Sequence, residues 1–289
     1  MLHILVTGAN GQLGSELRSL EPAYGHFGFT FIDLSEVDLT DESAVENYFS
    51  SKDFDVVLNC AAYTAVDKAE KDPLAAMKLN RDAVRYLSSQ CKAADTYLVH
   101  ISTDYVFDGS SSRPYREDDP TNPQSVYGLS KLAGEEAMMT CLSTGMIIRT
   151  SWLYSSYGNN FVKTIYSKAK EKGHLRVVAD QVGNPTYARD LAKAILDILP
   201  KALSDNELHI LHYSNEGICS WYEFAGEIVR TAGLPCTIEP ILTSEYPLPA
   251  PRPAYSALDK SHIKAIFGIE IPDWKDGLAR CLREMVPGS

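Results

Sequence analysis

Short apolar segments alternate with helical patterns through the first half of the chain, and this alternation restricts the fold more than any other feature. Runs such as HILV and DVVLNCAA are largely apolar without strict alternation, as is typical of strands buried on both faces of a sheet. Strands separated by helices form right-handed βαβ units, so we predict an α/β fold with a Rossmann-type, doubly wound parallel sheet. The predicted strands are residues 2–7, 27–33, 56–60, 97–102 and 146–150, and the predicted helices are residues 11–20, 43–50, 74–92 and 130–140.

The alternation becomes irregular after about residue 150. The proline-rich segment 235–256 interleaves aromatic and aliphatic residues, so we expect an ordered loop there, followed by a helical tail. The other predicted elements are helices at residues 161–172, 189–199 and 221–232 and a strand at residues 208–213. We expect a dinucleotide-binding domain of residues 1–150 and roughly 186–215, and a smaller α/β lobe of roughly residues 151–185 and 216–289.

The chain has 289 residues, a formal net charge of -11 and no run of basic residues. Nucleic-acid binding needs clustered Lys and Arg to neutralise phosphates, so this class of partner is excluded. No apolar segment approaches the roughly 20 residues that span a bilayer, and no signal peptide is recognised before the first strand. The six cysteines lie far apart, without a C-x-x-C pair. We therefore expect a cytoplasmic protein whose cysteines are reduced and mostly pack.

The segment VTGANGQLGSEL carries Gly8, Gly11 and Gly14 between the first predicted strand and the first predicted helix. In this context glycines permit a tight turn, close approach of the backbone to a pyrophosphate, and close packing of helix on strand. The phosphates then lie at the helix N-terminus, where free N–H groups and the helix dipole favour negative charge. Glycines also mark ordinary turns, but this position favours a dinucleotide site.

Asp33 ends the second predicted strand at about the spacing from the glycines that the dinucleotide fingerprint requires. Its carboxylate can accept hydrogen bonds from an adenosine ribose and repel a 2′-phosphate, which favours NAD over NADP; the alternative is a turn residue. Asp38 and Leu39 are candidates to flank the adenine. Ligands bind at the carboxyl ends of parallel strands. The third strand ends there in four candidate cofactor contacts, Ala61, Ala62, Tyr63 and Thr64.

Tyr127 and Lys131 in YGLSK are four residues apart and share one face if the segment is helical. A nearby ammonium lowers the pKa of a tyrosine from its ordinary value near 10, and a lowering by about three pH units suits protonation of a carbonyl oxygen. Such pairs are common by chance, and an isolated pair is an exposed tyrosine and a solvated lysine. Thr103 follows the fourth strand and can bond a substrate carbonyl or cap a turn. The order of these features after the glycine loop predicts a reductase.

The chain resembles the extended short-chain dehydrogenase/reductases and, within them, the dTDP-4-dehydrorhamnose reductase family. The resemblance covers essentially the whole chain and is carried by VTGANGQLGSEL, NCAAYTAVDKAE, STDYVFDG, VYGLSKLAGE, RTSWLY, GNNFVKT, DQVGNPTYARDLA and PAPRPAYSALD. It implies a Rossmann domain that binds NADPH or NADH, a C-terminal lobe for a nucleotide sugar, and reduction of the 4-keto group of dTDP-4-dehydro-β-L-rhamnose. Family members often use both cofactors, which weakens the preference drawn from Asp33.

The resemblance also implies roles for single residues. Thr103, Asp104 and Trp152 match substrate contacts, and Thr103 supports the proton donor Tyr127. The matching cofactor contacts are Gly11, Gln12, Leu13, Asp33, Asp38, Leu39, Ala62, Tyr63, Thr64, Tyr127 and Lys131.

Some members of the family dimerise around a magnesium ion that acidic residues hold. Glu16 matches the first of these residues, but Arg189 in PTYARDLA stands in the place of a second acid. A cation there repels a metal, so we expect a monomer or weak homodimer, no magnesium-bridged dimer and no metal site. We interpret Glu16 as an acid in the first turn of a helix, favoured by the helix dipole.

Three further features outside the motifs have competing interpretations. Arg252 in the proline-rich segment either binds the substrate pyrophosphate through its guanidinium fork or stabilises its loop by a salt bridge. His209 and His212 lie three apart on a predicted strand and point to opposite faces, so they do not form a metal site. Trp221 and Tyr222 are typical of helix packing.

Two alternative functions stay open at this point. One is another nucleotide-sugar enzyme on the same scaffold, an epimerase or a dehydratase; a dehydratase needs further carboxylates, and STD offers Asp104 without a following Glu. The other is a non-catalytic NADP-binding regulatory subunit that resembles the β-subunit of methionine adenosyltransferase. The combination of Thr103, Tyr127, Lys131 and Trp152 favours the enzyme.

Overall fold

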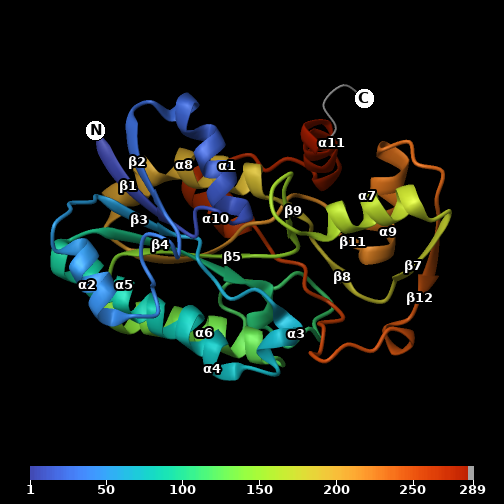
Figure 1. Ribbon diagram of the computed structural model, residues 1–289, viewed down its shortest axis with the longest axis horizontal. Coiled ribbons are helices and arrows are strands. Elements are labelled where there is room, and N and C mark those ends of the chain that lie inside the picture. Colours follow the sequence, from blue (N-terminus) through green and yellow to red (C-terminus); the bar gives the residue numbers. More distant parts are fainter. Residues whose placement is uncertain (286–289) are drawn as a thin grey trace.

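Six parallel strands form the central sheet of the computed structural model, which describes residues 1–285 (Figure 1). Their order is β10-β5-β4-β3-β1-β2, so the chain reverses direction across the sheet between β1 and β3. This is a doubly wound sheet, as predicted, and its crevice for ligands lies at the carboxyl ends of the strands beside that reversal. The strands are β1 (Leu2–Thr7), β2 (Phe27–Ile32), β3 (Val56–Asn59), β4 (Tyr97–Thr103), β5 (Gly145–Thr150) and β10 (Leu208–His212).

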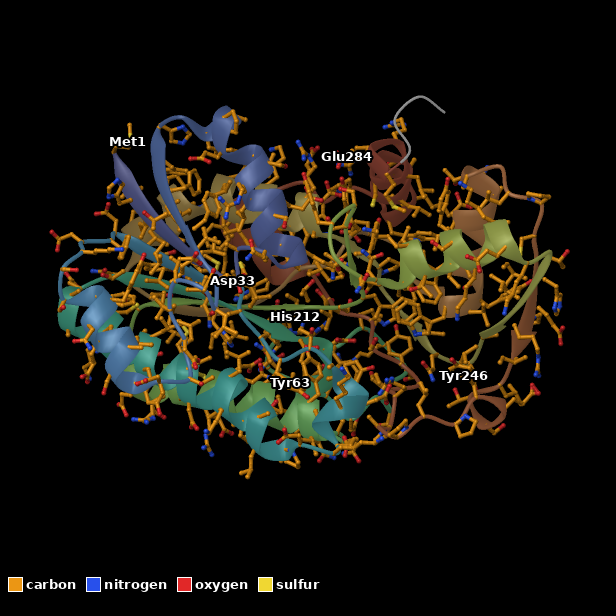
Figure 2. The ribbon with its side chains drawn as sticks, in the orientation of Figure 1. Met1, Asp33, Tyr63, His212, Tyr246 and Glu284 are labelled. Atoms are coloured by element: carbon orange, nitrogen blue, oxygen red, sulfur yellow. The ribbon has the colours of Figure 1, made fainter. Side chains whose placement is uncertain are left out.

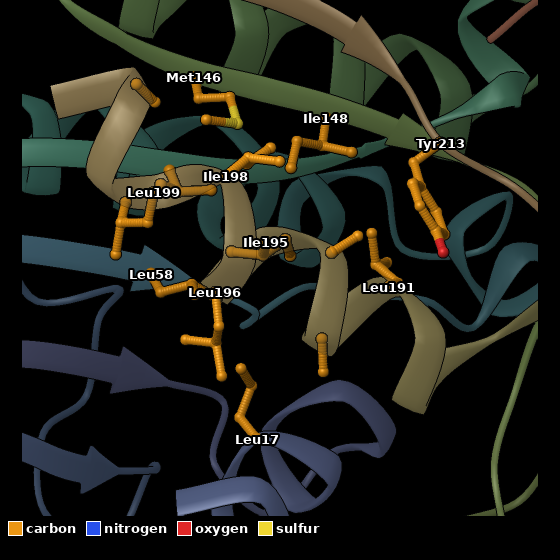
Figure 3. Close-up of a cluster of buried hydrophobic side chains, with 14 of the residues drawn as sticks. Leu17, Leu58, Met146, Ile148, Leu191, Ile195, Leu196, Ile198, Leu199 and Tyr213 are labelled. Carbon is orange, nitrogen blue, oxygen red and sulfur yellow. The ribbon is translucent and has the colours of Figure 1, made fainter. Parts of the chain in front are cut away.

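Helices cover both faces of this sheet. On one face α8 packs against α1 and the strands, with Leu191, Ile195 and Leu199 directed to the sheet and Leu196 near Leu17 (Figure 3). On the other face α5 packs between α2 and α6. These helices are α1 (Gln12–Leu20), α2 (Glu42–Phe49), α5 (Ala83–Ala94), α6 (Val126–Cys141) and α8 (Ala188–Asp205).

A second hydrophobic cluster lies outside the sheet, in the part of Figure 1 that carries α7, α9 and α11. Its centre includes the fully buried Phe224, Ile228 and Leu278. The helices are α7 (Phe161–Glu171), α9 (Trp221–Thr231) and α11 (Trp274–Met285), and α10 (Ser261–Phe267) packs near β10. The short paired strands are β6 (Leu153–Tyr154) with β9 (Thr186–Tyr187) and β8 (Val182–Gly183) with β11 (Cys219–Ser220).

Two of our predicted elements need correction. The segment 235–256 is not all loop, because β12 (Thr237–Ile241) pairs in parallel with β7 (His174–Val178). A two-stranded sheet has only edge strands, which tolerate the missing N–H of Pro240. We expected a single helix over residues 74–92. The structure instead has three consecutive helical segments there: α4 (Pro73–Met77), a π-helical turn (Lys78–Asp82) and α5. The last four residues of the expected C-terminal lobe, 286–289, lie outside the described residues.

The structure also bears on two expectations from composition. All six cysteines are free thiols, as predicted, and Cys91, Cys219 and Cys281 are buried. Within residues 1–285, no helix has both the length and the apolar character that crossing a membrane requires.

Candidate active site

The glycine loop after β1 has the geometry that a dinucleotide phosphate site requires. Gly8 has a φ of +63°, and a Cβ there would lie 2.6 Å from the backbone nitrogen of Ala61. A Cβ on Gly14 would lie 2.5 Å from the carbonyl oxygen of Gly8. Gly11, at the N-cap of α1, has no side chain to occupy the first-turn N–H groups of the helix. These groups therefore stay available to an anion.

The first cavity lies beside this helix end and has a volume of about 580 Å³. Residues from the glycine loop, the ends of β3 and β4, the start of α6 and the segment after β5 share its wall. It brings together ten of the predicted site residues, namely Gly11, Gln12, Leu13, Ala62, Thr64, Thr103, Asp104, Tyr127, Lys131 and Trp152.

A second cavity of about 470 Å³ lies on the β2 side. Asp33 closes the turn around it, since its carboxylate accepts the N–H of Asn10 at 2.8 Å and that of Leu34 at 2.9 Å. The turn interpretation of Asp33 is therefore correct, and the same carboxylate also lines the cavity. Figure 2 labels Asp33 and Tyr63 in this region. The predicted residues in its wall are Gly8, Asp33, Asp38, Leu39, Ala61 and Tyr63, whereas Gly14 lines neither cavity.

Tyr127 lies in the first turn of α6, where Ser125 caps the helix by accepting the N–H of Gly128 at 3.1 Å. Gly128 has to be small, because a Cβ would collide with the carbonyl oxygen of Tyr105. Burial raises the pKa of Tyr127 to about 12, hydrogen bonding with the Thr103 side chain opposes this rise, and the nearby Asp104 adds to it. The phenol is therefore protonated at neutral pH.

Lys131 follows one turn later and is only 1% exposed. Its Nζ donates to the carbonyl oxygen of Ile101 at 2.6 Å and lies 3.2 Å from Nε2 of His100. Burial lowers the pKa of Lys131 to about 8, and the charge of Glu135 opposes that change. Our prediction that Lys131 lowers the pKa of Tyr127 is wrong for this structure, because burial of the phenol dominates and the amine is engaged by β4.

Thr103 ends β4, Asp104 follows it directly, and both face the same cavity. The Thr103 hydroxyl donates to Oδ1 of Asp104 at 2.9 Å and accepts the N–H of Tyr105 at 3.3 Å. Burial raises the pKa of Asp104 to about 6. Within residues 1–285, its Oδ2 and the hydroxyl of Ser256 both lack a partner with hydrogen-bond geometry. The Ser256 hydroxyl nevertheless opposes the rise in the pKa of Asp104, so it lies near the carboxylate and is the group that a substrate hydroxyl would displace.

Trp152 and Trp221 form one aromatic wall of the cavity. Their rings stack 3.5 Å apart with an angle of 8° between the planes. Trp152 has a φ of +47°, and a Cβ on Gly183 would lie 2.8 Å from its indole. The interpretation of Trp221 as a helix-packing residue is incomplete, because the Trp221 side chain also lines two cavities. Its place directly after Ser220, the N-cap of α9, is the only sequence signal that could have indicated exposure to a site.

A third cavity of about 480 Å³ lies between α7, β7 and the segment 241–252. It shares Tyr105 and Trp221 with the first cavity, and Tyr246, labelled in Figure 2, also lines it. Arg252 lines it, and its guanidinium pairs with Asp67 at 2.8 Å. The salt-bridge interpretation of Arg252 is thus correct, while a contact with substrate stays a prediction.

Glu16 is fully buried in the middle of α1, so its interpretation as a first-turn acid is wrong. It accepts the hydroxyl of Ser155 at 2.6 Å and pairs with Arg189 at 3.3 Å. Arg189 also lies 3.7 Å from Glu284 of α11. The arginine thus occupies the space between two acids. Burial raises the pKa of Glu16.

Comparison with known proteins shows to which family the chain belongs. A family model described as the RmlD substrate binding domain matches residues 2–286. The chain belongs to this family. This chain is 42% identical to the spore coat polysaccharide biosynthesis protein SpsK of Bacillus subtilis, and the match covers 98% of both chains. It is 40% identical to the dTDP-4-dehydrorhamnose reductase of Aggregatibacter actinomycetemcomitans, over 96% of this chain and 97% of the relative.

A solved RmlD-family structure agrees with the fold throughout. The dTDP-4-dehydrorhamnose reductase of Bacillus anthracis, in complex with NADP, superimposes with a TM-score of 0.92 at 37% identity. The match covers 98% of this chain and 100% of that chain. The agreement over both chains includes the sheet and the part that carries α7, α9 and α11.

Proposed function

We propose that the chain is an NAD(P)H-dependent reductase that converts the 4-keto group of dTDP-4-dehydro-β-L-rhamnose into the alcohol of dTDP-L-rhamnose, a precursor of surface polysaccharide. One observation carries the proposal. A single cavity joins the N-terminus of α1 to Thr103, Tyr127, Lys131 and Trp152. The family membership and the relatives named dTDP-4-dehydrorhamnose reductase support the same reaction.

The two cavities beside the glycine loop fit a nicotinamide dinucleotide, NADPH or NADH. The N–H groups at the start of α1 and the close approach at Gly8 and Gly14 suit the pyrophosphate. Asp33, Asp38 and Leu39 would hold the adenosine, and Ala62, Thr64 and Lys131 the nicotinamide half. When bound, the nicotinamide supplies the hydride for the substrate carbonyl carbon.

Tyr127 is the proposed general acid. Its pKa of about 12 keeps the phenol protonated, so a proton is available for the carbonyl oxygen. Loss of that proton leaves a phenolate, and Lys131 on the same face of α6 would hold the nicotinamide ribose. Thr103 would turn its one hydroxyl hydrogen from Asp104 to the carbonyl oxygen, beside the phenol of Tyr127. Asp104 would accept a sugar hydroxyl through Oδ2, in place of its neighbour Ser256.

The third cavity is the proposed site for the nucleotide part of the dTDP-sugar. It opens toward the first cavity at Tyr105 and Trp221, so one substrate can occupy both. Arg252 would contact the pyrophosphate, and the stacked Trp152 would contact the sugar. This assignment supports our expected division, in which residues 151–185 and 216–289 form the nucleotide-sugar lobe.

We further propose a cytoplasmic monomer or weak homodimer without a bridging magnesium ion. The position of Arg189 between Glu16 and Glu284 supports this proposal, because a guanidinium and a divalent cation compete for the same oxygens. Sedimentation with and without magnesium and a chelator tests it, and a dimer that forms only with magnesium would contradict it.

The reaction is tested by mixing the purified chain with dTDP-4-dehydrorhamnose and following the absorbance of NADPH and NADH in parallel. We expect consumption of at least one cofactor with formation of dTDP-L-rhamnose. Unchanged absorbance with both cofactors at saturating substrate would refute the reductase. Recovery of a stable partner enzyme from the same preparation would then favour the regulatory alternative.

A further inference from the structure

A chain of buried side chains runs from β1 to the amine of Lys131. The Thr7 hydroxyl donates to Oδ1 of Asn59 at 2.6 Å, Nδ2 of Asn59 lies 3.1 Å from Nδ1 of His100, and Nε2 of His100 lies 3.2 Å from Nζ of Lys131. None of the four is more than 2% exposed. The proposed reaction uses only the last of them, so the purpose of the other three is unexplained.

The direction of the Asn59 amide determines where the proton of His100 lies. The backbone N–H of Ala61 can only donate, and it lies 3.2 Å from Oδ1 of Asn59, which fixes the amide oxygen on that side. The amide NH₂ therefore donates to Nδ1 of His100. Burial and the charge of Lys131 hold the pKa of His100 well below its ordinary value, so the ring is neutral. A neutral ring that accepts at Nδ1 carries its proton on Nε2.

This arrangement suits only one charge state of Lys131. The N–H at Nε2 of His100 points at Nζ, and an uncharged amine can accept it. An ammonium has three donors and no acceptor, so it needs a lone pair at Nε2. The ring proton must then be on Nδ1, and the oxygen of Asn59 must face His100. In that arrangement the N–H of Ala61 loses its acceptor.

We propose that His100 is a positioning residue whose tautomer follows the charge of Lys131, with the proton on Nδ1 beside the ammonium and on Nε2 beside the amine. Lys131 releases one proton in passing from ammonium to amine. The His100 ring stays neutral in both states, and only the place of its proton changes. The consequence for turnover rests on the proposed function, because Lys131 would hold the nicotinamide half, and its ammonium form, with three donors, requires the first arrangement.

The other ionisable groups around Lys131 do not account for such a change. Glu135 on α6 and Cys60 after β3 face the amine. Burial raises the pKa of Cys60, so it stays a thiol. Across the cavity, the pKa of Asp104 is raised to about 6 and that of Tyr127 to about 12. Of Cys60, Asp104, Tyr127 and Lys131, only Lys131 titrates near pH 8.

The test is a ¹⁵N NMR titration of the histidine side chains in the full-length protein, from about pH 6 to about pH 10, with His100→Gln to assign the His100 signals. We expect the His100 proton to move from Nδ1 to Nε2 with a midpoint near pH 8. His212 is an internal control, buried in the same sheet (Figure 2). Its Nδ1 lies 3.1 Å from the carbonyl oxygen of Tyr115, so its tautomer stays fixed. One His100 tautomer at every pH would overturn the proposal.

Two variants separate this coupling from general disturbance. Lys131→Met removes the titrating amine, so the His100 tautomer should no longer depend on pH. Asn59→Asp supplies a group that only accepts, which favours the proton on Nδ1 and therefore the ammonium of Lys131. The midpoint should rise by about one to three pH units. A midpoint unchanged in Asn59→Asp, or a titration that persists in Lys131→Met, would contradict the coupling.

The titration does not require turnover, so it separates this inference from the proposed reaction. If the chain reduces no substrate but His100 titrates as expected, the reductase fails and the coupling stands. If the chain is active and His100 keeps one tautomer, the coupling fails and the reductase stands. In an active enzyme, Asn59→Asp should shift the pH profile of turnover by the same amount as the NMR midpoint, whereas His212→Gln should leave the profile in place.

Discussion

The ion pair between Glu135 of α6 and Arg149 of β5 provides a direct test of how α6 is held against the sheet. Neither side chain is more than 3% exposed. The Nη2 and Nε atoms of Arg149 donate to the carboxylate at 2.7 and 3.0 Å, and the Ser102 hydroxyl donates to it at 2.5 Å. Glu135→Leu removes all of these acceptors and leaves a buried guanidinium without its charge partner.

We expect Glu135→Leu to lower the free energy of unfolding by about 3–5 kcal/mol, the range for breaking one side of a buried ion pair. An unfolding entropy of about 2.1 cal/mol/K per residue gives roughly 0.6 kcal/mol per kelvin for 289 residues. The melting temperature should therefore fall by about 5–8 °C.

Thermal and urea unfolding, each followed by circular dichroism and tryptophan fluorescence, measure this loss and show whether the transition is two-state. The matched control is the double variant Glu135→Leu/Arg149→Met, which removes both charges and should recover most of the lost stability. A single variant within about 1 kcal/mol of the wild type, or a double variant less stable than the single one, would show that the ion pair does not hold α6 in this way.

Three further predictions concern the cavities. Burial raises the pKa of Asp104 from 3.8 to about 6, so the charged carboxylate lowers the free energy of unfolding above pH 6 and has no such effect below the unfolded pKa. Asp104→Asn should therefore raise the free energy of unfolding by roughly 2–3 kcal/mol at pH 8. In urea titrations this gain should disappear near pH 4. Trp221→Ala removes the stack on Trp152 and should raise KM for the dTDP-sugar about tenfold, while the Kd of NADPH, measured by fluorescence, stays unchanged. Gly14→Ala places a Cβ 2.5 Å from the carbonyl oxygen of Gly8, so calorimetry should show weaker NADPH binding.

The sheet could be predicted from the sequence because its strands are buried on both faces. Each of β1, β3 and β4 contains a run of three consecutive buried apolar residues, and each predicted boundary falls within one residue of the observed one. By contrast, β12 lies at an edge, is partly exposed and contains Pro240, so neither alternation nor a continuous apolar run marks it. Local pattern therefore predicts buried elements better than edge elements.

The members of the candidate site could be predicted, but not how they interact. Strand ends and a helix N-terminus identify Thr103, Tyr127 and Lys131 by position along the chain. That Lys131 contacts His100 depends on how α6 packs against β4, and no spacing in the sequence encodes that contact. The stacking of Trp221 on Trp152 likewise joins two distant segments. Long-range packing thus determines the charges of the site.

The most direct test of the account is a single-turnover reduction of dTDP-4-dehydrorhamnose by enzyme preloaded with NADPH, compared between the wild type and Tyr127→Phe. The variant keeps the ring and its packing but has no proton to donate. We predict a fall in the rate of about 10²–10⁴-fold, the contribution of a positioned general acid, with little change in the Kd of NADPH. A variant that reduces the substrate at close to the wild-type rate would contradict the role of Tyr127 as proton donor.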